Sequence, residues 1–291
     1  MRIAEHVEGW APGPVESREV LARGPSDAFA ALLDQPSPVD VAGRGPAVLP
    51  PLWTAFHFLQ VPATAELGED GHPRAGHFLP PIPNRRRMFA GGRLSVRAPL
   101  FIGDEVVRRT ALTSVVPKAG RSGELLFVTL AHEYLRDGEV VQVEEEDLVY
   151  REQAPGAVRA DVAARSDPVE PTPVPNEWHI VLRPDEVLLF RMSALTYNAH
   201  RIHHDLAYAR DVEGFLSLVV HGPLLALMLL ELPRRFAPDR QVAEFAYRLR
   251  RPAFAGAAVV AAGKPDGSDL TCGVPGADPS ITGEVTLVTG K

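Results

Sequence analysis

The stretch Gly222-Pro-Leu-Leu-Ala-Leu-Met-Leu-Leu-Glu-Leu232 contains the longest apolar run of this 291-residue chain. A proline suits the first turn of a helix, because its φ angle is already helical and its missing N–H would have no partner there. Apolar side chains would point to every side of this helix, so protein must surround it. The run is well short of the ~20 residues that cross a bilayer, and we therefore expect a buried helix and no membrane segment.

The composition is that of a globular protein: 45% of the residues are hydrophobic, 23% are charged and the formal net charge is -7. No long block of like charges occurs, so a nucleic-acid partner is not expected. The single cysteine, Cys272, cannot form an internal disulfide, and the N-terminal residues lack the basic and apolar regions of a signal peptide. These features predict a cytoplasmic protein.

Two distant segments align without gaps, Arg97-Ala-Pro-Leu-Phe-Ile-Gly-Asp-Glu-Val-Val107 and Arg250-Arg-Pro-Ala-Phe-Ala-Gly-Ala-Ala-Val-Val260. They share Arg, Pro, Phe, Gly, Val and Val, which suggests an internal duplication. Between them, residues 153–177 are rich in proline and show no apolar periodicity, as expected of a linker. We therefore predict two related domains, at 1–152 and 178–291.

Each half is expected to end in an antiparallel meander and to carry helical sequence ahead of it. Strands are predicted at 105–116, 125–135, 140–150, 257–262 and 283–289, and helices at 26–33 with Ser26 as N-cap, at 184–196 and from Gly222. A sheet curled around a central helix, occurring twice, is the double hot-dog arrangement. We predict this α+β fold, with two antiparallel sheets that each wrap a central helix.

Polar residues gather just before the apolar helix, in Tyr197-Asn-Ala-His-Arg-Ile-His-His-Asp205 and at His221. The usual signatures of serine and metal hydrolases and of nucleotide-binding loops are absent. His203 is a natural general base, because an unperturbed imidazole has a pKa of about 6.5. Its polar neighbours at defined spacing favour catalysis over a buried structural histidine.

These two pieces resemble the motif of the MaoC-like, or (R)-specific, enoyl-CoA hydratases, which reads Asp-x-Asn-Pro-(Leu/Ile)-His-x-Asp followed by Val-His-Gly. On that resemblance His203 takes the place of the catalytic histidine and Asp205 that of the aspartate after it. The N–H of Gly222 takes the role of binding the thioester oxygen. Asn198 stands where the family has its second catalytic residue, an aspartate, and His200 stands where it has asparagine.

A longer resemblance covers nearly the whole chain. Residues 193–205, with Arg86-Arg-Met-Phe-Ala-Gly-Gly-Arg-Leu94 and Glu144-Glu-Glu-Asp-Leu-Val-Tyr-Arg151, are similar to the mesaconyl-C4-CoA hydratases, itaconyl-CoA hydratases and mitochondrial 3-hydroxyacyl-thioester dehydratases. In that group the Asn and His replacements are expected. The resemblance implies a hydro-lyase that reversibly hydrates a short branched or dicarboxylic enoyl-CoA. It implies no metal, and no cofactor beyond the coenzyme A of the substrate.

Catalytic and purely structural interpretations compete at several of these positions. Asn198 can hold the water through its amide or form a turn, and Asp205 can assist proton transfer or orient the loop. Gly222 can present an oxyanion-binding N–H at the positive end of the helix, or it can simply allow a tight turn. We expect His221 to support the base rather than act as one.

Candidate substrate-binding residues have weaker sequence signals than the catalytic motif. Tyr197 is expected to pack under the site, and His200 or His204 to line the acyl pocket or face solvent. The acidic run 144–147 is interpreted as an exposed face. Three consecutive arginines, Arg85, Arg86 and Arg87, suit the phosphates of coenzyme A, and a solvated basic turn is an equal interpretation.

The first half is expected to carry no active site of its own. Arg97 and Arg250 are 153 residues apart, and the same shift takes His203 and Gly222 back to Pro50 and Glu69. The first half would then be non-catalytic and would complete the acyl or coenzyme A tunnel.

Other functions stay open from the sequence. A 3-hydroxyacyl-thioester dehydratase of fatty-acid synthesis would use the same site, whereas a hot-dog thioesterase would need a carboxylate on the central helix, where only Glu231 is acidic. A metal hydrolase would use His200, His203 and His221. A non-catalytic acyl-binding module would explain Asn198. The expected partner is an acyl-CoA; a homodimer is compatible with the sequence, which does not decide the oligomeric state.

Overall fold

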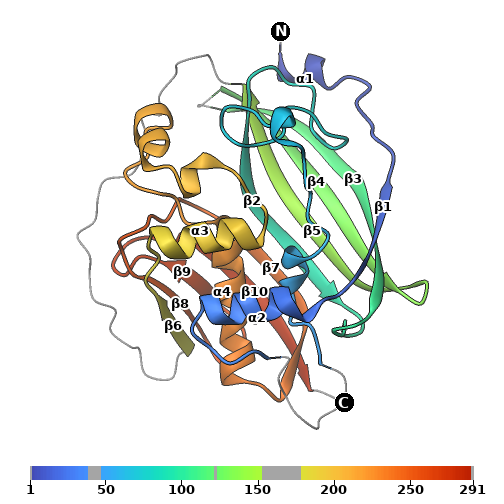
Figure 1. Cartoon of the computed structure of the whole chain (residues 1–291), viewed down its shortest axis with the longest axis vertical. Helices are drawn as coiled ribbons and strands as arrows, with labels where there is room; N and C mark the ends of the chain where they lie inside the picture. Colours follow the sequence, from blue (N-terminus) through green and yellow to red (C-terminus); the bar gives the residue numbers. More distant parts are fainter. Residues whose placement is uncertain (1, 39–46, 121–122, 153–177, 290–291) are drawn as a thin grey trace.

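The computed structural model describes residues 2–38, 47–120, 123–152 and 178–289 (Figure 1). The predicted linker at 153–177 lies outside these residues. No helix in the described ranges has both the length and the apolar character needed to cross a membrane.

The described residues form one ten-stranded sheet in which every neighbouring pair is antiparallel, in the order β1-β3-β4-β5-β2-β7-β10-β9-β8-β6. The first half contributes β1 (Val15–Val20), β2 (Arg85–Val96), β3 (Glu105–Gly120), β4 (Gly123–Arg136) and β5 (Glu139–Glu152). The second half contributes β6 (Trp178–Leu182), β7 (Arg240–Leu249), β8 (Val259–Gly263), β9 (Leu270–Gly273) and β10 (Ile281–Thr289). The two sheets are thus joined edge to edge through β2 and β7.

The strand order is the same in both halves when it is read outward from the β2–β7 junction. At the centre of that junction Arg93 pairs with Ala246, two residues with the same 153-residue separation as Arg97 and Arg250. Gly103 and Gly256, equivalent in the aligned segments, have φ angles of 95° and 92°. The register and these turns support an internal duplication around a pseudo-twofold axis.

The helices are α1 (Ile3–His6), α2 (Arg23–Leu32), α3 (Glu186–Leu195) and α4 (Gly222–Phe236). The prediction that Ser26 caps the first-half helix is wrong: the helix begins at Arg23, and Ser26 is fully buried inside it. Pro25 lies in the first turn, where no N–H is required, so the helix extends past it toward the N-terminus. Asp185 caps α3, since its carboxylate accepts a hydrogen bond from Leu188 N at 2.8 Å.

Helix α4 runs through the second half and packs against β6, β7, β8, β9 and β10. Leu224, Leu227 and Met228 are at most 1% exposed, as expected for a helix that protein surrounds. The double hot-dog fold is confirmed.

The first half differs from the expected arrangement in one respect. Between α2 and β2, the described residues 33–38 and 47–84 contain only two short 3-10 helices, η1 (Trp53–Phe56) and η2 (Thr64–Glu66). Eight prolines lie between Pro46 and Pro83, and this density prevents a long helix. A cavity of about 1620 Å³ lies beside this segment and is lined by residues of both halves.

Candidate active site

His203 lies in a 3-10 turn, η3 (Arg201–His203), and is 7% exposed. Its Nδ1 lies 2.7 Å from the carbonyl oxygen of Val219, so the ring carries its proton on Nδ1 and donates it to that oxygen. No described residue hydrogen-bonds to Nε2, which keeps a free lone pair. Burial lowers the pKa of His203 to about 4, so the ring is neutral at pH 7 and able to accept a proton.

The ring of His221 packs against the ring of His203. The two rings stack with centroids 3.7 Å apart and an interplanar angle of 16°. Nε2 of His221 lies 2.9 Å from Oγ of Ser193 on α3, which fixes the ring. Burial holds the pKa of His221 well below its usual value. His221 lines the cavity, and the ring of His203 stacks on it.

Gly222 begins α4, whose first-turn N–H groups have no partners within the helix. This positive end suits a developing oxyanion. A Cβ atom at position 222 would come within 2.6 Å of Leu249 Cδ2 and 2.9 Å of Phe89 Cδ1. Close packing at the β2–β7 junction therefore also favours glycine here.

Asn198 and Asp205 both hold the backbone of the motif. The side-chain oxygen of Asn198 accepts a hydrogen bond from His200 N at 3.0 Å. Asp205 accepts from Tyr208 N at 3.0 Å and from the Arg201 guanidinium at 2.7 and 3.0 Å. These two contacts also keep the pKa of Asp205 below its usual value. Both side chains thus make the backbone contacts of a turn, and a catalytic role for either stays a prediction.

Of the remaining motif residues, Tyr197 and His204 line the cavity, whereas His200 is not among its lining residues. Tyr197 does not pack under the site as expected: it is 57% exposed, has a φ of 51° and lines the cavity. His204 is exposed and also lines the cavity. The ring of His200 approaches that of His203 edge-on, with centroids 5.5 Å apart.

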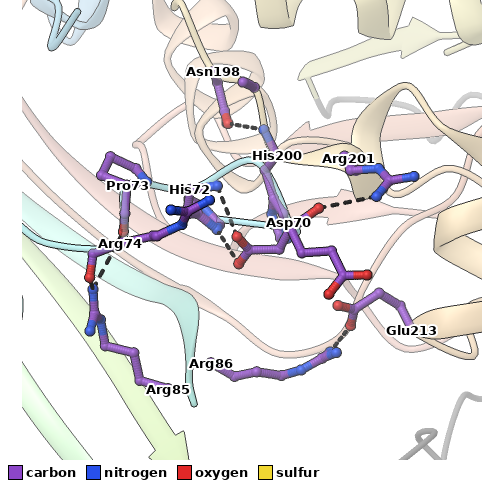
Figure 2. Close-up of polar contacts among 12 residues, drawn as sticks. Asp70, His72, Pro73, Arg74, Arg85, Arg86, Asn198, His200, Arg201 and Glu213 are labelled. Atoms are coloured by element: carbon purple, nitrogen blue, oxygen red, sulfur yellow. Dashed lines mark hydrogen bonds and ion pairs between the residues drawn. The ribbon is translucent and has the colours of Figure 1, made fainter. Parts of the chain in front are cut away.

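A loop of the first half completes the site, and the sequence interpretation missed it (Figure 2). Asp70 O accepts a hydrogen bond from Arg201 N at 2.9 Å, and His72 packs on His200 with ring centroids 4.0 Å apart. The signal was present as Glu69-Asp-Gly-His-Pro, a polar cluster between apolar and proline-rich stretches. Its distance of about 130 residues from the motif hid the relationship.

The three arginines belong to β2 and line the cavity, so they are not a solvated turn. Arg85 donates to the carbonyl oxygens of Pro73 and Arg74, and Arg86 forms an ion pair with Glu213. Arg87 extends its positive charge toward His72 and contributes to the lowered pKa of that ring, whose main cause is burial.

The acidic run is not an exposed face either. Glu144, Glu145 and Glu146 are half-buried and line the cavity. Glu144 accepts hydrogen bonds from the hydroxyls of Thr54 and Tyr134, and burial raises its pKa. The wall of the cavity formed by the first half is therefore polar.

The structure argues against two alternative functions, the metal hydrolase that uses His203 and His221 and the thioesterase that uses Glu231. The rings of His203 and His221 stack face to face, and neither residue belongs to the group of described residues whose ligand atoms converge. Glu231, the carboxylate that a thioesterase would need, is 1% exposed and ion-paired with Arg234 and Arg235. Among the described residues, Asp70, His72 and His200 bring ligand atoms within 4.8 Å of one another and are the group that could hold a metal ion.

Comparison with solved structures gives the class of protein. A structure described as a MaoC-like dehydratase matches with a TM-score of 0.69 at 18% sequence identity, covering 98% of this chain and 100% of the other. The fold is therefore that of the MaoC-like hot-dog proteins.

Comparison with protein families gives the particular family. The profile of hydroxyacyl-thioester dehydratase type 2 matches residues 53–255. A mesaconyl-C(4)-CoA hydratase of Chloroflexus aurantiacus is 41% identical over 263 residues, 90% of each chain. A mitochondrial hydroxyacyl-thioester dehydratase type 2 of Schizosaccharomyces pombe is 28% identical over 265 residues, covering 81% of this chain and 85% of the relative. The chain belongs to the hydroxyacyl-thioester dehydratase type 2 family, whose members are hydro-lyases.

Proposed function

We propose that this enzyme reversibly adds water to the double bond of a short dicarboxylic enoyl-CoA, with His203 as the general base. The observation that supports this most is the pinned ring of His203, whose Nδ1 proton is committed to Val219 while Nε2 stays free. A neutral imidazole with one committed proton is the form that deprotonates water.

The reaction balances on this chain's own residues. His203 Nε2 takes a proton from water while the water oxygen forms a bond to Cβ of the enoyl group. The π electrons move toward the thioester, and the Gly222 N–H stabilises the negative oxygen at the positive end of α4. His203 then returns the proton to Cα, which completes the addition of water. This sequence uses neither a metal nor a redox cofactor.

The dicarboxylic acyl group is inferred from two features. The Chloroflexus relative, at 41% identity, is named for mesaconyl-C(4)-CoA. The cavity carries Arg85, Arg86 and Arg87, whose guanidinium groups suit a carboxylate or the phosphates of coenzyme A. A longer 3-hydroxyacyl thioester is the second candidate, because the Schizosaccharomyces relative is named for such substrates. A cytoplasmic location and a homodimer stay predictions.

The test is the substitution His203→Gln, assayed by loss of enoyl-thioester absorbance. We expect kcat to fall about a hundredfold or more, because glutamine cannot accept the proton. His179→Gln is the matched control: this histidine lies on β6, outside the residues that line the cavity, and the variant should stay within about threefold of wild type. Near-wild-type activity in the His203 variant would contradict the assignment of the base.

A further inference from the structure

Asp70 and His72 form a carboxylate–imidazole pair at the end of the cavity. Oδ2 of Asp70 lies 3.0 Å from Nδ1 of His72, and Oδ1 accepts a hydrogen bond from His72 N at 2.9 Å. The carboxylate therefore holds both the ring and its backbone, and it selects the tautomer with the proton on Nδ1. Pairs of this kind fix the orientation of functional histidines in many sites.

The pair connects to the proposed base through one further ring. His72 packs on His200 at 4.0 Å between centroids, and His200 meets His203 edge-on at 5.5 Å. A row of three imidazoles thus begins at a carboxylate and ends at His203. Position 198 of the motif supplies no carboxylate to this row, because it is an asparagine, and its side-chain oxygen accepts the backbone N–H of His200.

The loop that carries the pair is seated tightly on the motif. Arg201 donates its backbone N–H to Asp70 O at 2.9 Å and its side chain to Glu69 O at 3.1 Å. Gly71 has a φ of 88°, and a Cβ there would lie 1.9 Å from Ala199 O. Only glycine allows this approach, so the chain is built to hold the pair against the site.

The charges around the pair favour a polar relay over a metal ion. The groups that face His72 are Asp70, His200 and the guanidinium groups of Arg85 and Arg87, and those that face His200 include Arg86 and Arg87. Tyr208 lies near Asp70, and Glu69, Arg86 and Arg201 are the other charged groups that act on Tyr208. A divalent cation would lie among these arginines and would compete with His72 for both carboxylate oxygens.

We propose that Asp70 and His72, from the first half, are a positioning pair of the hydratase site, which holds His200 against His203 and supplies a carboxylate at the start of the imidazole row, where position 198 of the motif is an asparagine. This inference rests on the proposed hydratase function. The first half is then more than the wall of a tunnel, because it contributes charge and orientation to the acid–base residues.

The experiment compares Asp70→Asn with Asp266→Asn by steady-state hydration kinetics. Asparagine at position 70 can still accept the His72 N–H, so the turn is kept and only the charge is lost. Asp266 makes the same kind of turn, accepting Ser268 N at 2.9 Å, in an exposed hairpin away from the cavity. We expect kcat of Asp70→Asn to fall about tenfold or more with KM changed less than about threefold, and Asp266→Asn to match wild type.

A second variant separates the ring from the turn. Asparagine in His72→Asn keeps an N–H donor near the position of Nδ1 but removes the ring that packs on His200. We expect a kcat loss similar to that of Asp70→Asn, and no further loss in the double variant, because the two residues act as one unit. Equal melting temperatures of the variants and wild type check that each folds.

The outcomes are distinguishable. If wild type hydrates the substrate and Asp70→Asn behaves like Asp266→Asn, the positioning pair is refuted while the hydratase function stands. If wild type is inactive on every enoyl-CoA tested, the proposed function itself fails. Stoichiometric metal in the purified protein, with activity lost to a chelator, would overturn the pair in favour of a metal centre.

Discussion

The proton affinity of His203 is set by its surroundings rather than by its own chemistry. Burial removes the water that would solvate an imidazolium ion and lowers the pKa of the ring to about 4. The hydrogen bond to Val219 O acts in the opposite direction but is the smaller effect. The rings of His72, His200 and His221 also have lowered pKa values. The site therefore holds a set of neutral histidines at pH 7.

This leads to a prediction about pH. An unperturbed histidine base would lose half its activity at a pH of about 6.5, whereas a base with a pKa of about 4 stays deprotonated well below that. We expect kcat/KM for hydration to stay level between about pH 5.5 and 8. The measurement is a pH–rate profile in buffers of constant ionic strength. An acid limb with its midpoint near 6.5 would contradict the assigned burial of the base.

Residue types and spacing indicated part of the candidate site in advance. The sequence motif singled out His203 and Gly222, whose catalytic roles stay predictions, because a base next to a helix start depends on local spacing. It did not reveal Asp70, His72 or Ser193, since these reach the motif only through tertiary packing. The motif also left both a turn-forming and a catalytic role open for Asn198 and Asp205, because the hydrogen-bond partners of their side chains depend on the fold.

Helix α4 has a functional end and a structural end. Its N-terminus faces the site, whereas Glu231 near its C-terminus is 1% exposed and ion-paired with Arg234 and Arg235. Arg234 continues to the side-chain oxygen of Gln35, which links the helix to the first half. Through Arg234, the Glu231 carboxylate therefore helps to connect the second half to the first.

We predict that Glu231→Gln destabilises the fold without slowing the chemical step. Two arginines would lose their buried partner, at a cost of about 3 kcal/mol in the free energy of unfolding, while kcat stays within about twofold. Urea unfolding and steady-state kinetics measure both effects. Glu244→Gln, an exposed glutamate on β7, is the control and should change stability by less than about 0.5 kcal/mol. A large kcat loss with unchanged stability would contradict the purely structural role of Glu231.

Among the elements, those with strong local signals were predicted best. The strands β3, β4, β5 and β10 and the helix α4 follow the apolar patterns that predicted them. The strand β2 was missed because it begins with three arginines and contains Gly91 and Gly92, which locally indicate a turn. These glycines are needed because a Cβ would meet Tyr247 O at 2.4 Å or Glu145 O at 2.4 Å, a constraint imposed by the neighbouring strands.

The whole molecule combines two halves of the same strand order with an uneven distribution of the candidate site residues. The second half keeps the central helix and the histidine motif. In the first half, proline-rich chain takes the place of a second long helix in the described residues 33–38 and 47–84, and the large cavity lies there. The repeat was visible in one aligned segment, whereas the cavity lies where the described residues form no long helix, a feature that leaves no positive sequence signal.

The most direct test of the account measures hydration by the purified protein. Mesaconyl-C4-CoA, itaconyl-CoA, crotonyl-CoA and a medium-chain enoyl-CoA would each be followed by loss of the enoyl-thioester absorbance, with free thiol monitored in parallel. We predict absorbance loss without thiol release, fastest for a dicarboxylic substrate. Thiol release at the same rate as the absorbance change would contradict the account, because it would make the protein a thioesterase.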